Sequence, residues 1–131
     1  MKLSDRKMLI VEDDPDIRQD IETYFRDNCG ALVTSAKNGK EGFELFSKNP
    51  NDFEIVLSDL NMEPMDGLGM IDQIKSAFPD TSAIFAILST EKNKAHRSRS
   101  KELGIRFWML KPFDGDSLVE TLSLYLERNS A

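Results

Sequence analysis

Charged residues follow three separate apolar runs of the chain, and their types could bind a cation next to a phosphate. The three junctions are residues 8–11 followed by Glu12-Asp13-Asp14, residues 55–58 followed by Asp59, and residues 107–110 followed by Lys111. If the runs are adjacent parallel strands, their carboxyl ends share one edge of a sheet, where ligand sites of open α/β sheets lie. The carboxylates and the ammonium would then form a cation site beside a potential nucleophile.

The chemistry of such a cluster favours a hard divalent cation. Two like charges 4 Å apart repel by about 4 kcal/mol at an effective dielectric of about 20. Crowded carboxylates would therefore exclude an incoming phosphoryl group unless a cation neutralised them. Mg²⁺ prefers oxygen ligands and bridges protein carboxylates to phosphate oxygens. An aspartate can also serve as the nucleophile, because carboxylates form acyl phosphates.

The elements that must position these residues alternate between two patterns. Apolar runs alternate with segments of helical period, which predicts βα units and a mostly parallel sheet. Strands are expected over residues 7–11, 31–36, 53–58, 83–88 and 105–110. A helix should follow each strand, with Asp14, Asn38-Gly39, Asp66 and Asp114 at the helix starts and Gly104 as the stop signal of the fourth helix, over residues 91–103.

Length and composition set further limits. A chain of 131 residues matches one domain, over residues 1–131, with 40% hydrophobic and 31% charged residues as in globular proteins. Cys29 is the only cysteine, which excludes an intramolecular disulfide or a zinc cluster and fits a reducing compartment. No apolar run approaches the roughly 18 residues of a membrane span, and no signal peptide is evident. We therefore expect a cytoplasmic protein without membrane contact.

Four motifs together resemble the receiver domain of two-component response regulators over almost the whole chain. They are VEDDP (11–15), SDLNMEPMDG (58–67), LSTE (88–91) and LKPF (110–113). Each follows a predicted strand, which is the structural context that makes a motif informative. The resemblance implies a flavodoxin-like, doubly wound (βα)5 fold of three layers, with a five-stranded parallel sheet in the order 2-1-3-4-5. It also implies a phosphorylation-activated signalling switch that is no enzyme beyond self-limited phosphotransfer and autodephosphorylation.

The resemblance further implies roles for individual residues. Asp59 would be the phosphoacceptor. The cofactor would be Mg²⁺, bound by Asp13 and Asp59, by Glu12 directly or through water, and by the backbone carbonyl of Asn61. Three residues elsewhere would respond to the phosphoryl group: Lys111 would pair with its oxygens, Ser89 would donate its hydroxyl, and Trp108 would change rotamer on activation. Two departures from the family pattern, Glu63-Pro64 and Thr90, remove none of these groups.

The resemblance also implies partners. The phosphodonor would be a sensor histidine kinase, and a downstream protein would bind the fourth helix, fifth strand and fifth helix. Residues 108–113 are similar to the stand-alone chemotaxis type, whose output is protein binding. One basic run in the fourth helix, Lys92, Lys94, His96, Arg97, Arg99 and Lys101, could belong to that surface. A net charge of −6 argues against nucleic-acid binding, and we expect a monomer or weak dimer.

Three alternatives stay open at the level of sequence. The chain could be the receiver portion of a longer regulator. A Mg²⁺-dependent phosphohydrolase with an aspartyl intermediate would need a second acid for the leaving group and a substrate loop, and neither is evident. A flavodoxin-like binding module would need a phosphate loop rich in Ser, Thr or Gly after the first strand, where this chain has carboxylates. Some polar residues are expected to have a structural role only. Asp14 and Asp66 should be helix caps, and His96 should be a surface residue.

Overall fold

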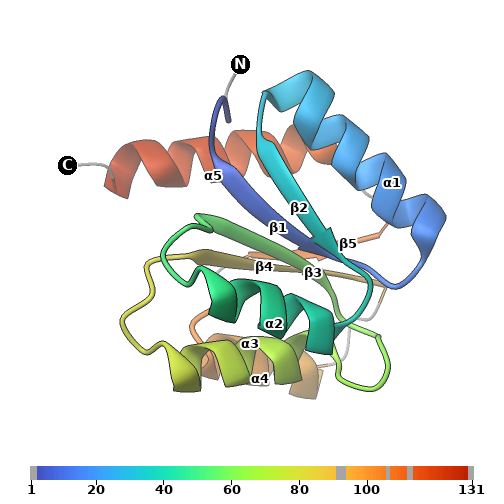
Figure 1. Ribbon diagram of the computed structural model, residues 1–131, viewed down its shortest axis with the longest axis vertical. Helices are drawn as coiled ribbons and strands as arrows, with labels where there is room; N and C mark the ends of the chain where they lie inside the picture. The colour runs from blue at the N-terminus through green and yellow to red at the C-terminus, as the bar shows by residue number, and fades with distance from the viewer. Residues whose placement is uncertain (1–2, 91–93, 106, 112–113, 130–131) are drawn as a thin grey trace.

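The computed structural model describes residues 3–90, 94–105, 107–111 and 114–129, with the backbone alone for residues 94–96 and 129. Five strands form one parallel sheet in the order β2-β1-β3-β4-β5, which confirms the predicted fold (Figure 1). The strands are β1 (Lys7–Val11), β2 (Leu32–Ala36), β3 (Ile55–Asp59), β4 (Ile84–Ser89) and β5 (Phe107–Leu110). The helices are α1 (Pro15–Thr23) with its π-helical continuation η1 (Tyr24–Asn28), α2 (Gly39–Lys48), α3 (Gly67–Ala77), α4 (Lys94–Glu102) and α5 (Gly115–Asn129).

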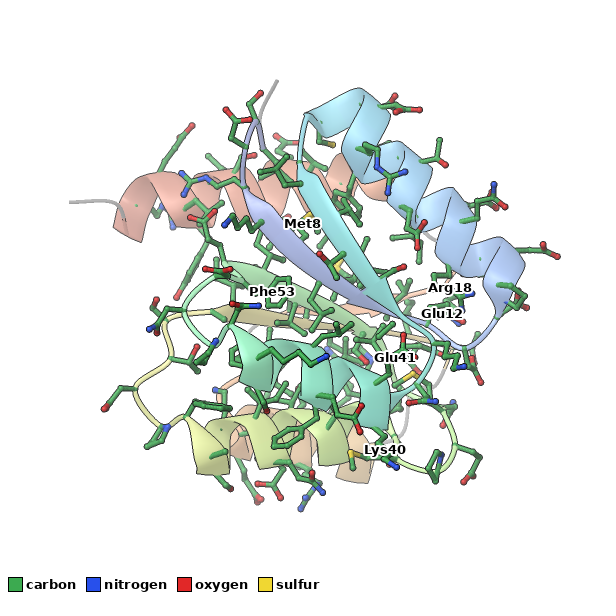
Figure 2. All side chains as sticks on the ribbon, viewed as in Figure 1. Met8, Glu12, Arg18, Lys40, Glu41 and Phe53 are labelled. Carbon is green, nitrogen blue, oxygen red and sulfur yellow. The ribbon has the colours of Figure 1, made fainter. Side chains whose placement is uncertain are left out.

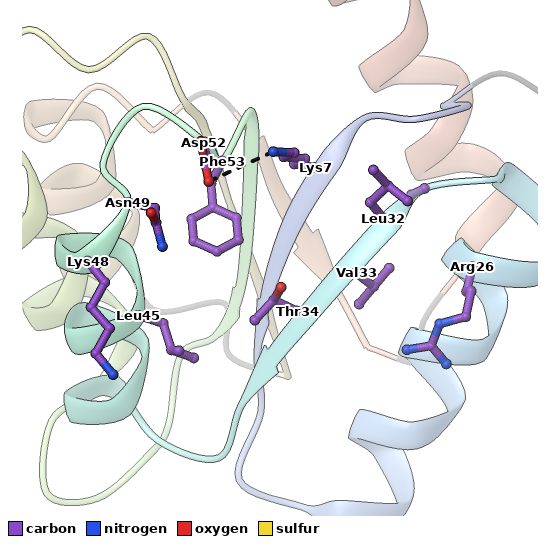
Figure 3. A pocket seen from close by; sticks show the side chains of 11 residues that line it. Lys7, Arg26, Leu32, Val33, Thr34, Leu45, Lys48, Asn49, Asp52 and Phe53 are labelled. Carbon is purple, nitrogen blue, oxygen red and sulfur yellow. Dashed lines mark ion pairs between the residues drawn. The ribbon is translucent and has the colours of Figure 1, made fainter.

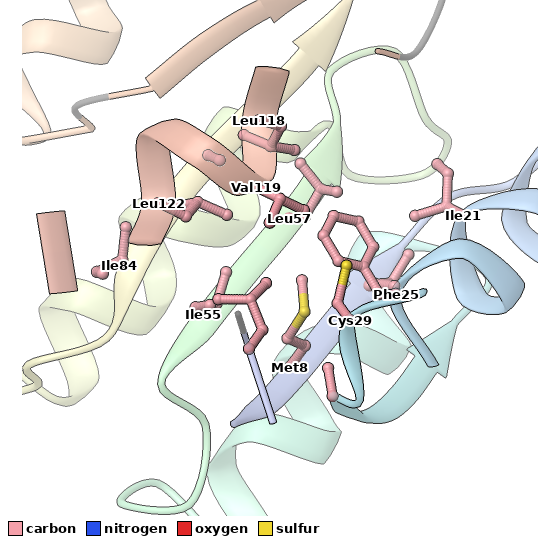
Figure 4. Packing of buried hydrophobic residues seen from close by; sticks show 14 of the residues in the cluster. Met8, Ile21, Phe25, Cys29, Ile55, Leu57, Ile84, Leu118, Val119 and Leu122 are labelled. Carbon is pink, nitrogen blue, oxygen red and sulfur yellow. The ribbon is translucent and has the colours of Figure 1, made fainter. Parts of the chain in front are cut away.

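Helices cover both faces of the sheet, so the chain forms three layers. Helices α1 and α5 lie on one face, and α2, α3 and α4 lie on the other (Figure 1). Beneath α1 and α5, one apolar cluster buries Phe25, Leu57 and Leu118 (Figure 4). A second cluster on the opposite face includes Phe46 and Ile71. Strands β3 and β4 are buried at every position, as expected for central strands of a parallel sheet. No helix in the described ranges is long and apolar enough to span a membrane.

Short polar side chains begin the helices where the sequence predicted. Asp14, Asn38, Asp66 and Asp114 each accept a hydrogen bond from a backbone N–H in the following turn. These side chains satisfy N–H groups that have no partner within the helix. Gly104 follows α4 with φ +75°, a conformation that glycine adopts without steric cost. The caps predicted at Asp14 and Asp66 and the stop signal predicted at Gly104 are therefore confirmed.

The structure differs from the predicted elements mainly at their ends. Strands β3 and β4 each run one residue further than predicted, to Asp59 and Ser89, because Asp59 pairs with Leu88 and Ser89 with Leu110 in the parallel registers. The fourth helix was predicted over residues 91–103, of which residues 91–93 lie outside the described part of the chain. Its described portion, α4, ends at residue 102.

Helices α1 and α5 make a close contact through Tyr24. The ring of Tyr24 occupies the space that a Cβ atom on Gly115 would need. The Tyr24 hydroxyl donates a hydrogen bond to the carboxylate of Asp116. This contact joins the beginning of α5 to the segment η1, and it depends on the missing side chain at position 115.

Candidate functional site

The sheet brings the ends of its strands to one edge. Val11 pairs with Ser58, Asp59 with Leu88, and Ser89 with Leu110. Because the strands run in the same direction, the residues at and after these ends gather at the carboxyl edge of the sheet. Glu12, Asp59, Ser89 and Lys111 thus come together from four different segments of the sequence.

Lys111 lies between two buried carboxylates. Its Nζ atom is 3.1 Å from Oδ1 of Asp59 and 3.7 Å from Oε2 of Glu12. Glu12 is only 1% exposed and Asp59 6%, whereas Asp13 lies at the surface. One carboxylate oxygen from each of Glu12, Asp13 and Asp59 lies within 4.8 Å of the others. Three acids therefore crowd around a single lysine.

The electrostatics of this cluster are unbalanced. Burial, and then the charge of Asp59, raises the pKa of Glu12 to about 7. Burial also raises the pKa of Asp59, although the hydrogen bond and charge of Lys111 oppose the increase. Burial alone would lower the pKa of Lys111, but its hydrogen bond to Asp59 and the nearby carboxylates raise it. The lysine thus stays charged without fully compensating the acids.

These residues fit a divalent cation. Oε2 of Glu12 is buried and accepts no hydrogen bond from any residue that the structure describes. A buried carboxylate oxygen without a donor is costly, and a cation would relieve that cost. The three acids offer only oxygen ligands, the type that Mg²⁺ prefers. Asn61 is exposed and lines a pocket of about 270 Å³ together with Asp13 and Glu63, so the cluster opens to solvent on this side.

The loop after β3 holds the Asp59 side chain in place. The backbone N–H of Leu60 donates to Oδ1 of Asp59 at 3.0 Å, and the N–H of Gly67 donates to the carbonyl of Leu60 at 2.9 Å. A Cβ atom on Gly67 would collide with the backbone carbonyl of Asp59. Gly67 therefore permits α3 to begin directly against the end of β3.

Arg18 is a positioning residue that the sequence analysis did not identify. Its Nη1 atom donates to the backbone carbonyl of Glu12 at 2.9 Å, and Figure 2 shows the two residues beside each other at the end of β1. Oε1 of Glu12 in turn accepts from the N–H of Asp14 at 3.3 Å. A cation one helical turn after the Asp14 cap, next to a run of acids, was the signal available in the sequence.

Ser89 and Trp108, which were predicted to respond to the phosphoryl group, lie on the two strands β4 and β5. Ser89 is fully buried at the end of β4. Trp108 lies on β5, half-buried against the apolar cluster on the α2, α3 and α4 face, and no described residue accepts a hydrogen bond from its buried Nε1. Glu91, Lys92 and the Pro112-Phe113 pair of the LKPF motif lie outside the described residues, as do the side chains of Lys94 and His96.

The fold and the site together define a class of signalling domain. A doubly wound parallel sheet in the order 2-1-3-4-5, with an acidic cluster and a lysine at its carboxyl edge, is the architecture of a receiver. The chain belongs to the response regulator receiver domain family, whose model matches residues 8–123. Receiver domains are signalling switches of two-component response regulators rather than classical enzymes.

Individual relatives include both short and long proteins. The chain is 30% identical over 107 residues to a probable chemotaxis protein CheY of Rhizobium etli, covering 82% of this chain and 81% of that protein. It is also 30% identical to the probable transcriptional regulator ycf27 of Guillardia theta, covering 95% of this chain but only 46% of the relative. Among solved structures, chemotaxis protein CheY4 of Vibrio cholerae superposes with a TM-score of 0.78 at 28% identity, covering 92% of this chain and 98% of that one.

Proposed function

We propose that the chain is a signalling switch that accepts a phosphoryl group on Asp59 from a phosphohistidine of a sensor kinase. The observation that carries this proposal is the contact of Lys111 with Asp59 inside a group of three convergent carboxylates. An isolated surface aspartate would lack both the cation and the neighbouring acids. Glu12, Asp13, Asp59 and the backbone carbonyl of Asn61 are the proposed ligands of Mg²⁺.

Hydrogen bonds orient the nucleophile. Oδ1 of Asp59 accepts from Lys111 and from the N–H of Leu60. Oδ2 is then the oxygen that attacks phosphorus, while the bond between phosphorus and the donor nitrogen breaks and the electron pair leaves with the imidazole. When bound, Mg²⁺ supplies charge neutralisation for the transferring group. Lys111 and the Ser89 hydroxyl would hold phosphoryl oxygens after transfer.

The acyl phosphate would change the balance between two conformations of the chain. A phosphoryl group on Asp59 competes for the ammonium of Lys111, which Glu12 and Asp59 share in the structure. Such a group favours whichever conformation brings donors towards its oxygens. We propose that Ser89 and Trp108 follow this change, because both lie on strands that end at the site.

The output surface would comprise α4, β5 and α5. Leu110 on β5 and Leu124 on α5 are 42% and 49% exposed, which suits an apolar contact with a partner protein. Arg97 is exposed on α4, and Arg99 is partly engaged by an ion pair with Asp72 at 3.1 Å. The output would be protein binding, as in chemotaxis. We further propose that residues 1–131 form a single domain and that the protein is a cytoplasmic monomer or weak dimer. It would contact neither nucleic acid nor a membrane.

Phosphorylation with acetyl phosphate tests the central proposal. In the presence of Mg²⁺, intact-protein mass should show one added phosphoryl group, and Trp108 fluorescence should change with acetyl phosphate or beryllofluoride. Asp59→Asn should show neither, whereas Asp80→Asn, an exposed acid after α3, should behave like the native chain. Equal phosphorylation of the Asp59→Asn protein would refute the assignment of the acceptor.

A second candidate concerns the protein that carries this domain. The relative of Guillardia theta, a probable transcriptional regulator, extends well beyond the region that matches this chain. We propose as this second candidate that the residues are one part of a longer regulator whose output lies elsewhere. The reading frame of the native gene and the mass of the native protein would distinguish this candidate from the stand-alone switch.

A further inference from the structure

The edge of the sheet at β2 has backbone hydrogen-bonding groups that the fold does not use. Among the strands of the described residues, β2 pairs with β1 alone. The N–H of Leu32 donates to the carbonyl of Arg6 at 2.8 Å, so the backbone groups of residue 32 point towards β1. Because these groups alternate in direction along a strand, the N–H and C=O of Val33 and Ser35 point outwards. No described residue of the chain forms a hydrogen bond with them.

This edge also lacks the usual protection against strand pairing. Natural edge strands commonly carry lysine, proline or a bulge. The sequence of β2 is Leu-Val-Thr-Ser-Ala, and its pairing with β1 is regular over all five positions. Leu32 is 51% exposed, the highest exposed fraction among the large apolar side chains in the described ranges. The edge is therefore open, and it presents the apolar side chain of Leu32 to solvent.

A groove of about 450 Å³ runs along the same edge (Figure 3). Leu45 and Phe53 line it on the α2 side, and Arg26 of η1 lies on the other side of β2. Leu45 packs against the apolar cluster beneath α2 and is half-buried, so part of its side chain also lines the open groove. The groove offers apolar contacts next to the unused backbone groups.

Two cations flank the groove. Arg26 and Lys48 are exposed, and neither forms an ion pair with any residue in the described ranges. A third cation, Lys7, pairs with Asp52 at 3.8 Å. In a chain of net charge −6, two unpaired cations on either side of an open strand create a local preference for an acidic ligand.

We propose that the β2 edge binds an extended acidic segment of a partner protein, which adds a strand to the sheet. Backbone hydrogen bonds to Val33 and Ser35 would give affinity, and alternate side chains would reach the groove and the cations, as in other cases of strand addition. A second copy of the chain fits less well, because pairing β2 with β2 would bring Arg26 and Lys48 of both copies together. This surface is separate from the α4, β5 and α5 surface and needs no phosphoryl group on Asp59.

A peptide of sequence Glu-Glu-Val-Thr-Val-Glu-Glu, labelled with fluorescein, tests the proposal. Anisotropy should show saturable binding with a Kd of about 1 mM or tighter, and the amide NMR signals of Val33 and Ser35 should shift. Arg26→Glu combined with Lys48→Glu should weaken binding roughly tenfold or more. The matched control, Lys40→Glu with Arg128→Glu, changes the net charge equally at exposed positions that do not line the groove, and should bind within about twofold of the native chain.

Ser35→Pro removes one outward N–H donor. An edge strand tolerates proline at such a position, and the variant should no longer bind the acidic peptide. If this variant does not fold, the charge-reversal pair decides alone. Three results would overturn the proposal. They are equal binding of a Lys-Lys-Val-Thr-Val-Lys-Lys peptide, amide NMR shifts that are confined to elements other than β2, and an unchanged affinity for the acidic peptide after the Arg26 and Lys48 reversal. Self-association in ultracentrifugation that Ser35→Pro abolishes would assign the edge to a second copy and overturn it as well.

Discussion

The two ends of the sheet use the same kinds of charged residue with opposite consequences. At the amino end, Arg6 lies 2.8 Å from Glu54, and both side chains are more than one-third exposed. At the carboxyl end, Lys111 contacts Asp59 and Glu12, whose side chains are 7% and 1% exposed. Water screens the first pair, whereas the second group must compensate its charges almost without water.

The comparison therefore distinguishes exposed charges, which hardly affect stability, from buried charges, which are costly to the fold. An exposed pair contributes little to stability, because water replaces either partner. The buried cluster places three carboxyl groups near one lysine, and burial, followed by the charge of Asp59, raises the pKa of Glu12 to about 7. We therefore expect the carboxyl end to lower the stability of the metal-free chain and to favour a bound cation.

The largest expected effect comes from removing the cation of the buried cluster. Lys111→Met should lower the free energy of unfolding of the metal-free protein by about 3 kcal/mol, because Asp59 and Glu12 lose their compensating charge. It should also slow phosphorylation of Asp59 by roughly a hundredfold. Urea unfolding in EDTA and mass spectrometry after acetyl phosphate treatment measure the two effects. A variant as stable and as reactive as the native chain would remove the contrast between the two ends.

Glu12→Gln should change stability in opposite directions with and without magnesium. The amide keeps an oxygen that can accept from the N–H of Asp14 and removes a charge that burial disfavours. In EDTA the variant should be about 1 to 2 kcal/mol more stable than the native chain. In saturating Mg²⁺ it should gain less stability from the metal, because one anionic ligand is lost. Equal stabilisation of both proteins by Mg²⁺ would contradict this role of Glu12.

The pH dependence of the metal-free protein sharpens the same point. The pKa of Glu12 is raised to about 7 in the folded chain from an ordinary value of 4.5. The folded state thus binds a proton that the unfolded state has lost, and this contribution to stability disappears as pH rises through 7. Stability should fall by about 1 kcal/mol between pH 6 and pH 8. Urea unfolding in EDTA at both pH values measures this fall, and the Glu12→Gln protein should lack it. If the free energy of unfolding depends on pH identically in both proteins, Glu12 is not the source.

The smallest effect is expected at the amino end. Arg6→Met, the counterpart of Lys111→Met, should change the free energy of unfolding by no more than about 0.5 kcal/mol, because the pair of Arg6 with Glu54 is exposed. It should leave phosphorylation of Asp59 unchanged. Thermal and urea unfolding provide the measurement, and a loss as large as that at Lys111 would show that burial does not distinguish the two ends.

Local signals in the sequence account for most of the fold. Alternating apolar runs and helical segments indicated the parallel sheet, and Asp14 and Asp66 marked helix starts because a capping carboxylate acts within one turn. The resemblance to receivers supplied the strand order. The gathering of Asp59 and Lys111 then follows from geometry, since the ends of parallel strands share an edge.

Contacts that join distant segments could not be predicted in the same way. The hydrogen bond from Arg18 to the carbonyl of Glu12 and the approach of Gly67 to the carbonyl of Asp59 depend on how a loop returns to its strand. Nothing in the apolar pattern indicated that Glu12 would be as buried as the strand before it. Nor did the pattern of α2 show that Leu45 would line a groove beside β2 as well as pack against the core.

The fit of the Tyr24 ring into the space beside Gly115 couples the side-chain volumes that positions 24 and 115 can hold. A side chain at position 115 would require the Tyr24 ring to move or a smaller residue at position 24, and a smaller residue at 24 alone would leave space beside Gly115. Substitutions at these positions should accordingly be found together among homologues, as a pair of compensating volumes that neither helix reveals alone.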